Sequence, residues 1–109
     1  MRYGISNWIY GDESLPDTFA RLERLGYEAI ELVGEPDQYS VDEINQLSTE
    51  SGVAVTSVLG WCIAGIPGRD LANPDEGERT AAIRYGKACI DLAAEVGASY
   101  LVVIPAPAG

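Results

Sequence analysis

The feature that most constrains the fold of this chain occurs three times: a helical stretch ends at a glycine, and an extended apolar run follows. The three segments are LGYEAIELVG from Leu25, SGVAVTSVLG from Ser51 and VGASYLVVIP from Val96. Glycine is favoured after a helix because the chain there turns left-handed, which costs glycine little. The runs that follow are rich in Val, Ile and Leu, which is typical of parallel strands buried on both faces.

Helix starts are also visible in the sequence. Ser14 precedes a first-turn proline, Ser40 and Glu43 form a capping box, and Asn73 is followed by Pro74. Each of these patterns is typical of a helix N-terminus. Each expected helix also has one apolar face, formed by Leu15, Phe19, Leu22 and Leu25, by Val41, Ile44 and Leu47, and by Ile83, Ile90, Ala93 and Val96.

These patterns predict strands and helices in alternation along a single partial domain, residues 1–109. The expected strands are 2–8, 29–33, 53–59 and 100–104, and the expected helices are 15–25, 41–50 and 75–96. This β(αβ)3 order indicates an α/β fold with a parallel sheet and right-handed crossovers. An open doubly wound sheet and the first four strands of a (β/α)8 TIM barrel, a half-barrel, both fit the order.

The connections favour the barrel. The first strand-to-helix turn, NWIYGDES, lacks a glycine-rich phosphate fingerprint, which weakens a nucleotide-binding doubly wound sheet. The helix-to-strand connections are short, whereas the strand-to-helix connections are long, above all GWCIAGIPGRDLANPD. TIM barrels carry their chemistry on that long-loop face, at the carboxyl ends of the strands.

The charge excludes a nucleic-acid partner. Seven basic residues, of which only Lys87 is a lysine, stand against 17 acidic residues, a net charge of -10. A chain this acidic repels a phosphate backbone. No apolar run reaches the length of a membrane span, and Cys62 and Cys89 lack metal-ligand spacing and are expected to be reduced thiols. We therefore expect a cytoplasmic protein that binds neither membranes nor nucleic acid.

Candidate site residues lie where the expected strands end. Asn7, Trp8 and Tyr10 follow the first strand, and Trp61, Cys62 and Arg69 follow the third. The second strand contains Glu31 and precedes Glu35, and residues 105–107 follow the fourth strand. Two tryptophans at the ends of two parallel strands could wall an apolar pocket that stacks on the carbon face of a substrate, or could merely plug the mouth of the sheet.

We predict four substrate-binding residues, Trp8, Glu31, Trp61 and Arg69. Glu31 stands alone in an apolar run, so its carboxylate lies either inside a barrel, where it needs a partner, or under a helix. It serves either substrate contact or hydrogen bonds to neighbouring strands. Arg69 either holds a substrate anion or forms a local ion pair with Asp70. The other acids, including Glu28 and Glu35, are expected on solvated faces.

The sequence contains no histidine. A histidine general base, a Ser-His-Asp triad and a histidine metal site are therefore excluded within this chain. Carboxylate-only magnesium or manganese sites remain open, but the strand ends offer only Glu31 and Glu35. We therefore predict neither a catalytic residue nor a metal ligand in this chain.

Three stretches together resemble a known family. RYGISNWIYGDESLPDTFARLERLGYEAIELVGEP, VTSVLGW and RDLANPDEGERTAAIRYGKACIDLAAEVGASYLVVIPAPAG are similar to the opening half of a sugar phosphate isomerase/epimerase of the xylose isomerase-like TIM barrels. The resemblance covers essentially the whole chain. It implies a metal-dependent isomerase or epimerase acting on a small sugar, polyol or keto-acid.

In such enzymes a divalent ion, often manganese, magnesium, cobalt or zinc, polarises the substrate oxygens while carboxylates move a proton through an enediolate. The resemblance places the family's metal ligands on strands five to eight, which have no counterpart here, and places Trp8 and Trp61 on the substrate side. The family's endonuclease branch carries histidines where this chain has Gly60-Trp61 and Ile104-Pro105, which argues against DNA repair.

Three hypotheses follow. The first is the N-terminal half of a barrel of about 250 residues, inactive by itself, in which residues 105–109 begin an active-site loop. The second is a homodimer of half-barrels closed through the exposed edge strands, 2–8 and 100–104. The third is an open sheet that binds a small ligand without chemistry. A sequential strand order would favour the barrel over the doubly wound sheet.

Overall fold

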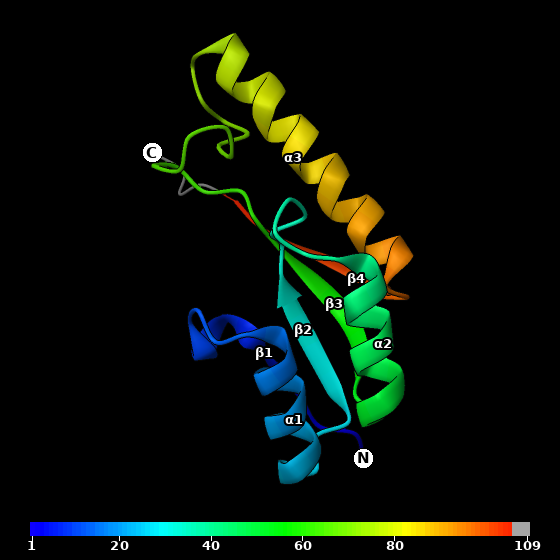
Figure 1. The fold of residues 1–109 in the computed structure, drawn as a ribbon. Coiled ribbons are helices and arrows are strands. Elements are labelled where there is room, and N and C mark those ends of the chain that lie inside the picture. The colour runs from blue at the N-terminus through cyan, green and yellow to red at the C-terminus, as the bar shows by residue number, and fades with distance from the viewer. Residues whose placement is uncertain (106–109) are drawn as a thin grey trace.

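The computed structural model describes residues 1–105 and contains one parallel sheet of four strands (Figure 1). The elements in chain order are β1 (Gly4–Ser6), the 3-10 helix η1 (Asn7–Tyr10), α1 (Leu15–Leu25), β2 (Ala29–Val33), α2 (Val41–Ser51), β3 (Ala54–Trp61), α3 (Glu76–Glu95) and β4 (Tyr100–Ile104). The strand order is β1-β2-β3-β4. This sequential order confirms the half-barrel and excludes the doubly wound sheet, in which the order reverses.

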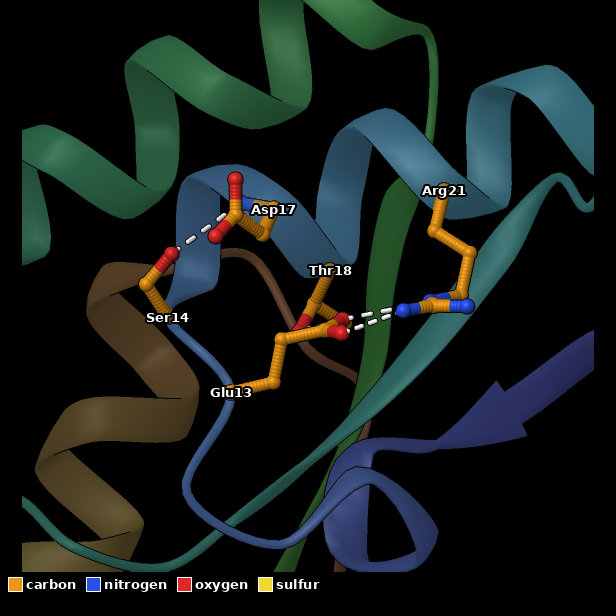
Figure 2. A network of polar contacts seen from close by, with 5 residues as sticks. All are labelled: Glu13, Ser14, Asp17, Thr18 and Arg21. Carbon is orange, nitrogen blue, oxygen red and sulfur yellow. Dashed lines mark hydrogen bonds and ion pairs between the residues drawn. The ribbon is translucent and has the colours of Figure 1, made fainter.

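Serine side chains begin the first two helices, as predicted. The Ser14 hydroxyl accepts a hydrogen bond from the Asp17 N–H at 3.3 Å (Figure 2), and the Ser40 hydroxyl accepts one from the Glu43 N–H at 3.3 Å. Each bond satisfies a donor that the first helical turn would otherwise leave unpaired.

The start of α3 differs from the prediction. Asp75 caps this helix, and its carboxylate accepts from the Glu78 N–H at 2.9 Å. Asn73, which we expected to be the cap, lies two residues earlier, where its side-chain oxygen accepts from the Asp75 N–H at 2.9 Å. An aspartate and an asparagine cap equally well, so sequence alone does not distinguish the two positions.

The first strand is shorter and the third longer than predicted. β1 covers three residues, because the Ser6 hydroxyl accepts from the Trp8 N–H at 3.3 Å and starts η1. At the other end of η1, Gly11 has a φ of 60°, which turns the chain toward α1. β3 continues to Trp61. Trp8 therefore leaves the sheet in a helical turn, whereas Trp61 is the last residue of a strand.

The three helices lie along one side of the sheet (Figure 1) and enclose the hydrophobic core against it. Ile30 and Leu32 of β2 and Val55 and Val58 of β3 point into this core. Helix residues that are fully or nearly fully buried complete it, among them Phe19, Leu22, Ile44, Cys89 and Leu92.

Three residues predicted on buried helix faces are exposed instead. Leu25 is 58% exposed, Ile83 51% and Ile90 55%. Leu25 is the last residue of α1. α3 buries three small side chains, Ala82, Cys89 and Ala93, together with Leu92. Ile83 and Ile90 are seven residues apart and therefore share a face of the helix, which is turned to solvent.

The opposite side of the sheet corresponds to the inner wall of a barrel. Side chains alternate between the two faces of a strand, so Glu31 points away from the core that Ile30 and Leu32 enter. The register places Ser6, Glu31, Ser57 and Tyr100 in one row across the four strands, with an irregularity between Ile30 and Glu31. We call these four residues the polar row.

Candidate functional site

The two tryptophans of the chain meet at the carboxyl end of the sheet. The β1–α1, β2–α2 and β3–α3 connections all emerge at this end, because the strands are parallel (Figure 1). The ring centroids of Trp8 and Trp61 are 5.9 Å apart, and the ring planes are inclined by 32°. Trp8 is 59% exposed, and Trp61 is half-buried. Trp8 lies just after β1 and Trp61 ends β3. Since β2 lies between these two strands, the pair spans the end of β2.

A cleft of about 660 Å³ opens beside Trp8. Its lining combines aromatic rings and polar groups, including Asn7, Trp8, Glu35, Gln38 and Tyr39. Small-molecule sites commonly pair apolar walls with a few placed polar groups. The cleft lies between the β1–α1 and β2–α2 connections, on the long-loop face of the sheet.

Asn7, which lines this cleft, joins two other segments through its side chain. Its side-chain amide donates to the Tyr39 hydroxyl at 3.3 Å, and its side-chain oxygen accepts from the Val33 N–H at 2.8 Å. Burial raises the pKa of Tyr39, so its hydroxyl stays protonated at neutral pH. Tyr39 was absent from the sequence-based candidates, since a tyrosine before a helix cap carries no motif.

Arg69 pairs with a different carboxylate from the one expected. Its guanidinium donates two hydrogen bonds to Glu35, at 3.0 and 2.7 Å, and the hydrogen bonding raises the pKa of Arg69. The expected partner, Asp70, accepts instead from the Ala72 N–H at 2.9 Å. The expectation of a solvated Glu35 is therefore also wrong. The ion pair ties the β2–α2 connection to the β3–α3 connection.

Glu31 is held within the sheet. The Ser57 hydroxyl donates to its carboxylate at 2.6 Å, which is one of the two roles the sequence left open, a hydrogen bond to a neighbouring strand. Ser57 precedes Trp61 by four residues, or about 13 Å at the rise of a strand. The structure thus brings Trp8 and Trp61 together. Glu31 instead contacts Ser57, and Arg69 contacts Glu35.

Both cysteines are buried and free. Burial raises the pKa of Cys62 and of Cys89, so both thiols are protonated at neutral pH. A thiol needs to ionise to act as a nucleophile. Both side chains are almost fully buried, and Cys89 belongs to the hydrophobic core.

The described residues do not fit a divalent metal. Across positions 1–105, no three His, Cys, Asp or Glu side chains are close enough together to hold an ion. The two carboxylates considered for such a site, Glu31 within β2 and Glu35 after it, are bonded to Ser57 and Arg69. Within the same range, no helix has the length and apolar character needed to cross a membrane.

Four parallel strands in sequential order, with helices on one side and long loops at the carboxyl end, define the first half of a (β/α)8 barrel. Residues 19–109 match the family model of the xylose isomerase-like TIM barrel. The chain belongs to the xylose isomerase-like TIM barrel family.

Solved structures agree with this fold. A D-psicose 3-epimerase determined in the presence of D-fructose aligns with a TM-score of 0.71 at 16% identity, over 94% of this chain and 37% of that one. A D-psicose 3-epimerase from Clostridium cellulolyticum H10, with D-tagatose, aligns at 0.70 and 19% identity, over 94% and 37%. A probable 3-DHS dehydratase from Bacillus anthracis aligns at 0.68 and 17% identity, over 95% and 38%.

The chain thus spans just over a third of the length of these three structures. At such identities the likeness establishes the fold alone. No curated protein matches the chain.

Proposed function

We propose that this chain is the N-terminal half of a sugar isomerase or epimerase and forms part of the wall of its substrate pocket. The observation that carries this proposal is the Trp8–Trp61 pair, 5.9 Å between ring centroids, at the carboxyl end of the sheet. Family membership and the sugar epimerases among its structural neighbours support the substrate class, a small sugar, polyol or keto-acid.

The chemistry of the pair suits a carbohydrate-like ligand. The carbon-bound hydrogens of a sugar form an apolar face, which an exposed indole ring can cover. The hydroxyl groups at the ring edge need hydrogen-bond partners, and the cleft beside Trp8 offers polar side chains such as Gln38 and Glu35. The net charge of -10 opposes a nucleic-acid substrate.

The proposal assigns proton transfer to residues outside this chain. A divalent ion, manganese, magnesium, cobalt or zinc, would stabilise an enediolate in the complete barrel, but the described residues offer no ligand set for it. We therefore expect the chain alone to be inactive. The structural neighbours include epimerases and a probable dehydratase. The proposal therefore names a class of reactions, isomerisation, epimerisation or dehydration, and not one of the three. The free cysteines support a cytoplasmic location.

A turnover assay tests the assignment of chemistry. The purified 109-residue chain is incubated with manganese and a panel of ketoses and aldoses, and products are separated by chromatography. We expect no conversion. Conversion by the chain alone would show that it contains its own catalytic groups and would contradict the proposal.

A binding assay tests the substrate side separately. Tryptophan fluorescence is recorded while D-fructose or D-tagatose is added, because Trp8 and Trp61 are the only tryptophans. We expect a saturable change that is lost in Trp8→Phe and retained in Tyr27→Phe, a change at the other end of the sheet. A response that is identical in Trp8→Phe and the unmodified chain would remove Trp8 from the pocket.

The exposed flank supports a second candidate, a homodimer in which two half-barrels close on each other. We call the exposed apolar side chains of α3 and β4 the flank; they are Ile83, Ile90, Tyr100, Val102 and Val103, each between 41% and 70% exposed. Edge strands readily pair with another chain, and a two-fold axis along the barrel would close both edges. Sedimentation velocity decides it, since a monomer at micromolar concentration excludes the dimer.

A further inference from the structure

We propose that Tyr85 of α3 is a positioning residue that fixes Trp61 against Trp8. The importance of this geometry for a substrate rests on the proposed function, but the geometry itself can be measured without any ligand.

The hydroxyl of Tyr85 joins the ends of β2 and β3. It accepts a hydrogen bond from the Trp61 N–H at 3.0 Å and donates one to the Gly34 carbonyl at 2.7 Å. Just before this point the two strands still bond directly, since the Gly34 N–H donates to the Leu59 carbonyl at 2.8 Å. Beyond this point the backbones of β2 and β3 separate, and the Tyr85 hydroxyl takes the place of a direct backbone hydrogen bond between them.

The tyrosine itself is held on several sides. The Arg69 guanidinium lies 4.2 Å from the ring centroid, a distance typical of a cation–π contact. Arg69 is in turn fixed by Glu35 through two hydrogen bonds. Burial raises the pKa of Tyr85, so the hydroxyl keeps the proton that it donates to Gly34.

Gly34 leaves the space that this arrangement needs. A Cβ atom at this position would lie 2.7 Å from the Cys89 sulfur, 2.8 Å from the Leu59 carbonyl oxygen and 3.0 Å from the Tyr85 hydroxyl. These distances are shorter than ordinary van der Waals contact, so only glycine lets α3 approach closely enough for the hydroxyl to reach the strand ends.

The consequence concerns the Trp61 backbone. Without the hydroxyl, the Trp61 N–H and the Gly34 carbonyl both lose their partner, and unpaired half-buried backbone groups move to find water. Trp61 ends β3, so such a movement turns its indole ring relative to Trp8. Tyr85 therefore acts on the aromatic pair through the backbone of Trp61.

Circular dichroism provides the test, because two indole rings at this separation couple and give a two-signed band in the far ultraviolet. We expect the band in the unmodified chain, its loss in Trp8→Phe and Trp61→Phe, and its loss in Tyr85→Phe while the helical signal is retained. Tyr27→Phe, which removes a hydroxyl from another half-buried tyrosine, should leave the band unchanged.

Two results would overturn the inference. One is a band of full amplitude in folded Tyr85→Phe, and the other is the absence of the band from the unmodified chain. If Tyr85→Phe is partly unfolded, the measurement is repeated in trimethylamine N-oxide, which favours the folded state. A two-signed band that returns together with the helical signal contradicts the inference. A band that stays absent while the helical signal returns supports it. A failed sugar titration with an intact band would instead contradict the proposed function.

Discussion

At the scale of single residues, Gly34 is tightly packed, since an added Cβ would lie within 3.0 Å of three neighbouring atoms. We expect Gly34→Ala to lower the free energy of unfolding by about 1–3 kcal/mol, because an added methyl group in a packed site forces its neighbours apart. Urea denaturation followed by circular dichroism measures the change.

Gly86 provides the matched control for that substitution. It lies within α3, and a Cβ there would have no neighbour within 4 Å. Gly86→Ala should raise the free energy of unfolding by up to about 1 kcal/mol, since alanine favours the helix over glycine. Equal effects of the two substitutions would contradict the close packing of Gly34.

The Glu35–Arg69 ion pair is the second prediction at this scale. Both side chains are largely buried, at 25% and 20% exposed, and the two hydrogen bonds are charge-assisted. A double-mutant cycle with Glu35→Gln and Arg69→Gln should give a coupling free energy of about 1 kcal/mol, above the typical exposed pair. Additive effects of the two changes would show that the pair contributes nothing to stability.

Contacts between single residues that are distant in the sequence could not be predicted from the sequence. Trp8 and Trp61 could be placed at the same end of the sheet, because parallel strands end together. Tyr85 could not, because its partners Gly34 and Trp61 are 51 and 24 positions away and a tyrosine within a helix is read as a packing residue. The Glu35–Arg69 pair was missed for the same reason, since Asp70 is the nearer acid in sequence.

At the scale of elements, a network of polar contacts lies at the N-terminal end of α1 (Figure 2). It joins Glu13 and Ser14, which precede the helix, to Asp17, Thr18 and Arg21 within it. Glu13 accepts hydrogen bonds from the side chains of Arg21 and Thr18. The Arg21 hydrogen bond lowers the pKa of Glu13 below its usual value. Glu13 therefore stabilises the fold above the pKa of an unfolded glutamate and loses this effect as the pH falls through its depressed pKa.

We therefore expect Glu13→Gln to lower the melting temperature at pH 7 and to have less effect as the pH falls into the acid range. Thermal melts of both proteins over this range measure the difference. Glu23→Gln on the same helix is the control. A difference between Glu13→Gln and the unmodified chain that stays constant down to the lowest pH would contradict the role of the ion pair.

Helices and strands were predictable where one periodic pattern dominates. The caps of α1 and α2 and their glycine ends, Gly26 and Gly52 with φ of 81° and 73°, follow directly from residue type. α3 was less predictable, because apolar residues occur on more than one of its faces. Its small residues, such as Ala82 and Cys89, pack against the sheet, and this left Ile83 and Ile90 on the surface.

At the scale of the whole molecule, the second candidate, a homodimer of half-barrels, can be tested at the flank of Ile83, Ile90, Tyr100, Val102 and Val103. Exposed apolar side chains beside an edge strand favour contact with another chain. If the unmodified chain forms this homodimer, the double variant Ile83→Gln/Ile90→Gln should sediment as a smaller species at the same concentration. Ile9→Gln, at a residue 55% exposed in η1, is the control; equal effects of the two changes would show that the flank is not special.

The polar row of Ser6, Glu31, Ser57 and Tyr100 has a consequence for any chain segment that completes the sheet. A strand added beside β4 can slide along it, and a slip of one residue exchanges the faces of all its side chains. The side chains of the added strand share a face with Tyr100 only in registers that differ by an even number of residues. The polar row thus restricts the register of any strand that pairs with β4, because a shift by one residue would place apolar side chains level with the row.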